Sequence, residues 1–348
     1  MCFTMSCVVL NFCRDHLTNL DLLTKSIGIM GSYLSAVLKV ICFLVNRKEL
    51  MELHQTLEKY FDETFTCDPE VRIGIFDSLS IFIRPSFAIT ILVFIGTLVF
   101  FLTPLIVLFV QYSHDVHPLK YILPYPGKYP WIFEGGGFVY YVHYSWEILA
   151  GLYLFCVTSG VDSLFGYYVF QIHAIFRMMS HRMRNLSSDD EDYGATIRDC
   201  VYKHRMLGHC KDLFQKIYGP IVLWMFLTSA IIMCTLIFQA SETPEMTIGY
   251  AILFTVYISM KLLQALMYAW YGGIVYTESE EFREAVYASG WPGSGDKTLM
   301  SNILIMMSHK PLVIVACKFL TVSTDMFANI VNATMSYFFL LQTLDEGN

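Results

Sequence analysis

The chain has 348 residues, of which 55% are hydrophobic and only 15% charged, whereas soluble domains usually carry about 25% charged residues. Because one soluble core cannot bury that much apolar surface, the composition excludes an ordinary soluble domain and predicts an all-α membrane protein with several spans. The net charge of −7 and the absence of a basic run argue against nucleic acid as a partner.

Apolar segments in chain order predict a seven-transmembrane helical bundle. Residues 1–12 are apolar but too short for a full span, and they lack the basic start and the small-residue cleavage site of a signal peptide. We therefore expect them to be a truncated, partial first span. Six further segments are long enough to cross the membrane, at residues 26–45, 86–110, 138–168, 218–239, 247–271 and 308–344.

The positive charges predict the orientation of these spans. Lysine and arginine are concentrated in the loops after the second, fourth and sixth spans, while the loop after the third holds only Lys120 and Lys128. Since basic loops stay in the cytoplasm, we expect a cytoplasmic N-terminus and an extracellular C-terminus. The outer loop 111–137 is rich in proline and glycine, which fits either an ordered lid or a plain connector.

Helical patterns continue beyond the expected membrane boundaries. Apolar residues follow the fourth span to about Met183, and a mixed, helix-like stretch precedes the fifth. We expect spans two to four within residues 26–168, cytoplasmic helical extensions at 169–217, spans five and six within 218–271, and a second cytoplasmic segment at 272–307. The alternative is that these extensions are amphipathic helices lying on the membrane surface.

The last span, 308–344, carries a polar stripe. Its members recur at steps of three, four or seven, which places them on one helical face. They are Lys318, Thr321, Asp325, Asn329, Asn332, Ser336 and Thr343, with Leu340 on the same face. Such a face is costly against lipid and should meet protein or water. Two interpretations remain open: a face bonded to neighbouring helices, or a water-lined path narrowed by Leu340.

The sequence contains no recognisable catalytic pattern. It lacks a P-loop, HExxH, GxSxG or kinase signature, and its cysteines form no CxxC pair with a matching partner, so we expect no enzyme, metal or cofactor. Aromatic and sulfur-containing residues in the outer halves of the spans fit a pocket for a small apolar ligand, although ordinary packing would give the same pattern. The residues expected in this pocket are Met30, Tyr33, Phe101, Trp146, Leu149, Phe254 and Tyr257.

Two C-terminal segments carry a family resemblance. FREAVYASGW (282–291) and SNILIMMSHKPLVIVACKFLTVSTDMFANIVNATMSYFFLLQTL (301–344) resemble the C-terminal signature of insect odorant receptors. The residues that carry the resemblance are Tyr287, Trp291, Pro311 at the opening of the last span, Phe319, the run 327–331, Ser336, Tyr337, Phe338, Leu340 and Leu341.

The resemblance implies a tuning subunit of an odorant-gated, non-selective cation channel in the plasma membrane of olfactory sensory neurons. It also implies a heterotetramer with the odorant co-receptor, a small volatile apolar ligand and contact with membrane lipid. Each subunit would contribute its last helix to a shared pore, and the residues expected to form the pore and its gate are Asn332, Ser336, Leu340 and Thr343. The odorant site would lie between spans two, three, four and six, and the cytoplasmic segments would anchor the tetramer. Family members begin with a complete first span, whereas this chain starts later.

Other receptor and transport families fit the sequence less well. Gustatory receptors share the architecture but end in a TYxxxxxQF pattern, whereas here Ser336 replaces the threonine, Gln342 comes one residue early and Leu344 stands where phenylalanine would. A G-protein-coupled receptor needs an external N-terminus, which the charge pattern denies. A transporter would show inverted repeats and paired broken helices, and none is visible.

Overall fold

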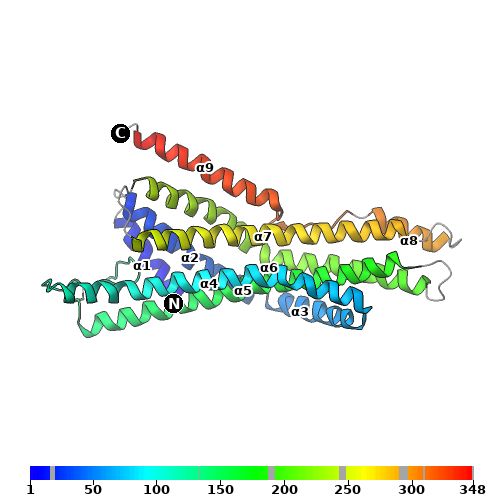
Figure 1. Cartoon of the computed structure of the whole chain (residues 1–348), viewed down its shortest axis with the longest axis horizontal. Coiled ribbons are helices and arrows are strands. Elements are labelled where there is room, and N and C mark those ends of the chain that lie inside the picture. Colours follow the sequence, from blue (N-terminus) through cyan, green and yellow to red (C-terminus); the bar gives the residue numbers. More distant parts are fainter. Residues whose placement is uncertain are drawn as a thin grey trace.

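Long helices run side by side along one axis of the computed structural model, which describes residues 1–15, 20–131, 133–186, 193–242, 248–289, 297–308 and 310–346 (Figure 1). The elements in chain order are α1 (Cys2–Asp15), α2 (Leu20–Val45), α3 (Arg47–Asp62), the 3₁₀ helix η1 (Glu63–Thr66), α4 (Pro69–Ser113), α5 (Phe138–Arg184), α6 (Tyr193–Glu242), α7 (Ile248–Ala288), α8 (Lys297–Ser308), β1 (Val315–Ala316), β2 (Leu320–Thr321) and α9 (Thr324–Glu346).

The four longest helices are much longer than a membrane is thick. Helices α4, α5, α6 and α7 have 45, 47, 50 and 41 residues, which at 1.5 Å per residue corresponds to roughly 60–75 Å. The hydrocarbon core of a bilayer measures about 30 Å. Within the described residues, α2, α4, α5 and α6 each contain a stretch that is long and apolar enough to cross it. The chain is therefore a multi-pass membrane protein whose helices continue outside the bilayer.

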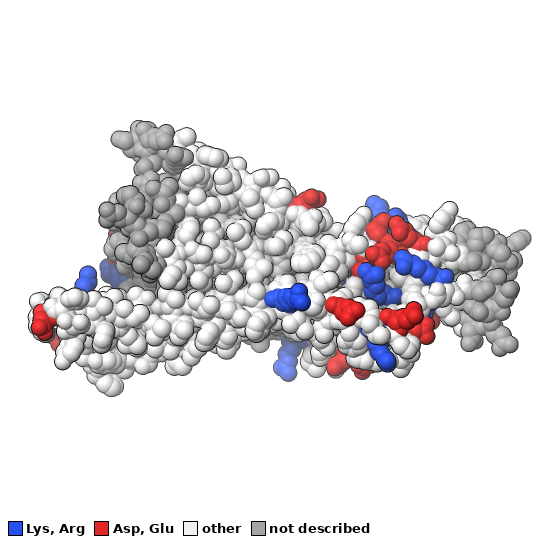
Figure 2. Space-filling model, in the orientation of Figure 1, with Lys and Arg blue, Asp and Glu red and all other residues white. Residues whose placement is uncertain are grey.

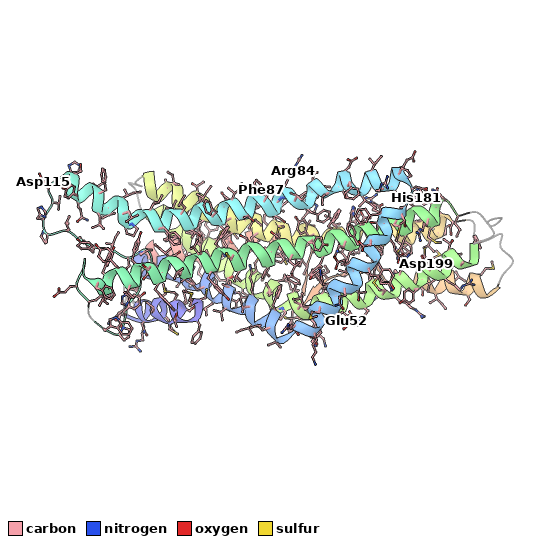
Figure 3. The ribbon with its side chains drawn as sticks, turned by 90° about the horizontal axis from the view of Figure 1, so that it is seen from below. Glu52, Arg84, Phe87, Asp115, His181 and Asp199 are labelled. Carbon is pink, nitrogen blue, oxygen red and sulfur yellow. The ribbon has the colours of Figure 1, made fainter. Side chains whose placement is uncertain are left out.

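Charged residues mark which half of the molecule lies outside the bilayer. On the face drawn in Figure 2, lysine, arginine, aspartate and glutamate gather at the end that holds α3 and α8, while the long middle part is almost free of them. Figure 3 places Glu52, His181 and Asp199 toward this end and Asp115 at the opposite extreme. The apolar stretch of α4 after Arg84 thus runs through the half of the molecule whose drawn surface is almost free of charge, which we call the uncharged half although its interior holds a few buried charged residues.

Helix α5 is the centre of the charged half. Between Phe165 and Met183 most of its residues are buried on every side, as expected for a helix surrounded by others. The Phe282 ring on α7 packs against Phe176 on α5 and His204 on α6, with centroids 5.9 and 5.7 Å away, and Arg177 Nε donates to Glu278 Oε1 at 3.1 Å. The extensions of α5, α6 and α7 therefore pack into a bundle instead of lying singly on a surface.

The last span differs from the expected one. Helix α8 ends at Ser308, and residues 310–314 are neither helix nor strand before the antiparallel hairpin of β1 and β2. Cys317 and Lys318 both have positive φ, and the Phe319 amide donates to the Ala316 carbonyl at 3.0 Å, as in a type I′ turn. The expectation that Pro311 opens the span and that Lys318 and Thr321 begin its helical face is therefore wrong. The β-branched run 313–315 favours an extended backbone, and the helix begins at Thr324.

Candidate functional site

A cavity lies between α2, α4, α5, α6 and α7 in the uncharged half of the bundle. About 860 Å³ of space free of protein atoms lies in and in front of this cavity, counting the open space at its mouth. Most of the side chains around it are apolar or aromatic, and hydroxyl groups are interspersed among them. Its lining is Ile29, Ser32, Tyr33, Ser35, Leu38, Lys39, Val93, Gly96, Thr97, Phe100, Tyr125, Leu154, Thr158, Ile221, Trp224, Met225, Thr228, Tyr257, Met260, Lys261 and Gln264.

The loop between α4 and α5 supplies one wall of this cavity through Tyr125. The Tyr125 ring stands edge-on to Tyr33 at 5.5 Å and lies 4.9 Å from Phe100, measured between centroids. Close approach to α5 is possible because residue 151 is glycine: a Cβ there would come within 2.7 Å of the Tyr125 hydroxyl and 2.9 Å of Phe101. The cavity is thus closed on this side by a residue that no helix carries.

A buried carboxylate holds the same loop in place. Glu147 on α5 accepts hydrogen bonds from the Tyr125 backbone amide at 3.0 Å and from the Tyr129 hydroxyl at 2.9 Å. Burial raises the pKa of Tyr129 above its usual range, and the neighbouring Glu147 carboxylate raises this pKa further. The Tyr129 phenol therefore stays protonated and donates its hydrogen bond. The loop is therefore an ordered lid, and the plain connector considered from the sequence does not describe it.

Hydrogen bonds that involve hydroxyl groups connect neighbouring helices around the outer part of the cavity. The Tyr257 hydroxyl donates to the Gly28 carbonyl at 2.8 Å and lies 2.7 Å from Ser32 Oγ, which joins α7 to α2. Trp224 Nε1 donates to Ser35 Oγ at 2.8 Å, which joins α6 to α2. Because these groups bond mainly to one another, the cavity presents a largely apolar surface with few free polar atoms.

The inner end of the cavity contains charged residues that the sequence prediction did not select. Lys39, Asp162 and Lys261 are 4%, 1% and 5% exposed. Asp162 Oδ1 accepts from Lys39 Nζ at 2.5 Å and from the Tyr268 hydroxyl at 2.7 Å, and its Oδ2 accepts from Gln264 Nε2 at 2.6 Å. The sequence does contain a signal for these residues: they are ionisable residues within apolar spans, where a charge is costly and usually has a role.

The structure places only two of the seven residues predicted for the pocket in the lining of the cavity. Tyr33 and Tyr257 line the cavity, and Phe101 packs behind it in a cluster with Tyr33 and Tyr125. Met30 and Phe254 are half-buried and are not part of the lining. Trp146 and Leu149 are 39% and 51% exposed. The residues of α5 that face inward are Glu147, Ala150, Leu154 and Thr158, which leaves Trp146 and Leu149 on the outer side of the helix.

Helix α9 presents two different faces. Met326, Ile330 and Thr334, spaced by four residues, are buried where α9 packs on α6 and α7. The other side, which includes the expected pore positions, is exposed in the single chain, and its members are Asp325, Asn329, Asn332, Ser336, Leu340 and Thr343. Ser336 and Thr343 hydroxyls donate to carbonyls of their own helix, those of Asn332 and Leu340, at 2.9 and 2.8 Å. In Figure 1 the C-terminal part of α9 stands away from the other helices.

The residues that carry the family resemblance lie at several places. Tyr287 near the end of α7 and Tyr337 on α9 are 68% and 54% exposed, Pro311 is half-buried in the segment before β1, and Trp291 lies outside the described residues. Across the part of the chain that the structure describes, no three His, Cys, Asp or Glu side chains are grouped so that they could hold a metal ion.

Comparisons with known proteins agree with this architecture. The solved structure of the insect olfactory receptor OR5 from Machilis hrabei in complex with eugenol superposes with a TM-score of 0.79 at 17% sequence identity, covering 97% of this chain and 87% of that one. Odorant receptor 82a of Drosophila melanogaster is 22% identical over 345 residues, or 97% of this chain and 88% of that protein. The odorant receptor coreceptor of Anopheles gambiae is 28% identical over 151 residues, or 43% of this chain and 31% of the coreceptor.

The likeness to OR5 shows the seven-transmembrane fold of insect olfactory receptors, as predicted from the sequence. The sequence model of the family described as 7tm Odorant receptor matches residues 19–335, which is most of the chain and includes every helix that lines the cavity. The chain therefore belongs to the 7tm odorant receptor family.

Proposed function

We propose that this chain is the odorant-tuning subunit of a ligand-gated, non-selective cation channel that it forms with the odorant co-receptor in the plasma membrane of olfactory sensory neurons. Family membership supports an odorant ligand, and the similarity to the coreceptor over 151 residues supports assembly with such a partner. The observation that carries the proposal is the exposed polar side of α9, because a membrane protein rarely leaves such a face against lipid.

In this proposal the exposed side of α9 faces a pore shared by four subunits. The opposite side is occupied by packing on α6 and α7, so the polar side is available to a passage at the centre of a heterotetramer. Asn332, Ser336 and Thr343 would line the passage, and Leu340 would narrow it. A hydrophobic constriction holds a pore closed by excluding water.

The ligand site in this proposal is the cavity between α2, α4, α5, α6 and α7. OR5 of Machilis hrabei was solved in complex with eugenol, and the cavity here has the apolar lining and the few fixed polar groups that suit a small volatile molecule. Tyr33 and Tyr257 are the two residues of the sequence prediction that we retain for this site. The cytoplasmic bundle of α5, α6 and α7 would anchor neighbouring subunits to one another.

The test is an odorant panel on cells that express this chain with and without an insect odorant co-receptor. We expect some odorants to evoke cation currents only when both proteins are present, with both detected at the cell surface by tags. If both are at the surface and no odorant in a broad panel changes the current, the chain does not act as a tuning subunit with that co-receptor.

A further inference from the structure

The inner end of the cavity holds more positive than negative charge. Lys39 from α2 and Lys261 from α7 both line the cavity and are almost fully buried, while Asp162 from α5 is the carboxylate next to them. These are the charges that act on Lys261. Glu147 lies further out and is occupied by the lid, where it accepts hydrogen bonds from Tyr125 and Tyr129.

Asp162 already accepts hydrogen bonds from three other side chains. Three groups donate to its two oxygens, from Lys39, Gln264 and Tyr268, at 2.5–2.7 Å. Lys261 Nζ has no hydrogen bond or ion pair to any described residue, and it lies 5.9 Å from the centroid of the Tyr257 ring. Two ammonium groups therefore share one carboxylate, and Lys261 faces the cavity without an ion pair of its own among the described residues.

An unpaired ammonium in an apolar interior is costly, because protein atoms there replace only part of its hydration. Ionisable groups within membrane spans usually mark sites that bind or move a charged partner. Here the space beside Lys261 is the cavity itself, so a partner with the opposite charge could occupy it.

We propose that the cavity binds carboxylic acids, with the ionised carboxylate paired to Lys261. This rests on the proposed function of the cavity as the odorant site. One negative charge balances the one unpaired positive charge, and Gln264 and Thr228 line the same cavity as further polar groups. The hydrocarbon tail lies outward among Tyr33, Phe100 and Tyr125, whose rings enclose the apolar part.

The first experiment varies the ligand and leaves the protein unchanged. The complete chain is expressed with the co-receptor, and currents are recorded for straight-chain acids from butanoic to decanoic acid, each beside its methyl ester, aldehyde and alcohol. We expect the acids to be the more potent members of each set by about tenfold or more, since hydrogen bonds to charged groups are the stronger ones. If the esters, aldehydes or alcohols activate equally well or better, the proposal is wrong and the receptor function stands.

The second experiment removes the charge. Lys261→Met keeps an unbranched side chain only one atom shorter and should lower the potency of acids by about ten- to hundredfold, while aldehydes and alcohols keep or gain potency because the lining becomes more apolar. Lys261→Arg keeps the charge and should retain most of the acid response. Lys48→Met removes the same charge from an exposed position of α3 and serves as the matched control.

The outcomes separate the carboxylate site from other roles of Lys261. An equal loss of acid and neutral responses in Lys261→Met, with normal surface levels, would mean that the lysine positions helices and does not bind ligand. If that variant fails to reach the surface, the comparison of acids with their esters on the unaltered protein still decides. If no ligand of any class evokes a current with both subunits at the surface, the proposed function itself fails, and the carboxylate site falls with it.

Discussion

At the scale of single residues, Asp162 is the polar centre of the membrane half. It joins α5 to Lys39 on α2 and to Gln264 and Tyr268 on α7, and all of these contacts are buried. A buried charged pair contributes little to the stability of the fold when compared with an apolar pair of the same shape. Removing one partner, however, leaves the other charge unpaired in an apolar interior. The network therefore makes the helix arrangement sensitive to single substitutions at this residue.

We expect Asp162→Asn to destabilise the protein by about 3–5 kcal/mol, because Lys39 then lacks its counter-charge. The measurement is surface expression together with thermal unfolding in detergent. Asp77→Asn, which neutralises an exposed aspartate on α4, is the control and should change neither quantity. A melting temperature of Asp162→Asn equal to that of the unaltered protein would contradict this account.

Tyr257 connects the cavity to α2 through Gly28 and Ser32. Tyr257→Ala removes both an aromatic wall and this connection, so odorant potency should fall by about tenfold or more, whereas the current evoked by a co-receptor agonist should remain. Tyr153→Ala on α5, where the tyrosine is exposed, should leave both unchanged. Parallel loss of the odorant and co-receptor responses in Tyr257→Ala would instead indicate misfolding.

At the scale of elements, α9 combines a buried and an exposed side in one helix. Burial at Met326, Ile330 and Thr334 fixes the helix on α6 and α7 at its N-terminal part, and the hairpin before it is held by side chains of the same two helices. Gln215 on α6 accepts from the Val315 amide at 2.7 Å, and Ser279 on α7 accepts from the Leu312 amide at 2.9 Å. The start of α9 is thus coupled to the helices that line the cavity.

Leu340→Ala should raise the basal current several-fold when expressed with the co-receptor, because a smaller side chain leaves a wider constriction that water can fill. Whole-cell recording without odorant measures this effect. Met335→Ala, at an exposed position of α9 away from the polar stripe, is the matched control and should leave basal current low. An unchanged basal current together with unchanged ion selectivity in Leu340→Ala would place the gate elsewhere.

At the scale of the whole molecule, the helices join an uncharged half to a charged half. The long helices cross from one to the other, and the charged half contains α3 and α8 (Figure 1, Figure 2). Basic loops stay in the cytoplasm, so the charged half is expected inside the cell and the free end of α9 outside it.

An epitope tag placed after Asn348 should therefore stain on intact cells. A tag inserted after Cys67, in the connection between η1 and α4, should stain only after permeabilisation. Immunofluorescence on matched intact and permeabilised cells gives the answer. Staining in the reverse pattern would invert the topology and place the exposed end of α9 in the cytosol.

Much of the candidate site could not be predicted from the sequence. The stripe on α9 was visible because helical periodicity is a local property, and its members from Asp325 onward do share the exposed side of that helix. The pocket was harder, since aromatic content does not show which side of a helix faces inward: Tyr257 lines the cavity, but Trp146 faces outward. Pairing of Lys39 with Asp162, which are far apart in the sequence, depends on how α2 and α5 pack.

The sequence by itself determined the membrane class, the helical spans and the family resemblance, because hydropathy and periodicity act over short stretches of chain. Only the tertiary structure decided that the last helix begins at Thr324 after a hairpin, that Tyr125 closes the cavity, and that Lys261 faces it with no ion pair to a described residue. Each of these depends on contacts between segments distant in the chain, and no local pattern records which of several compatible neighbours a side chain will meet.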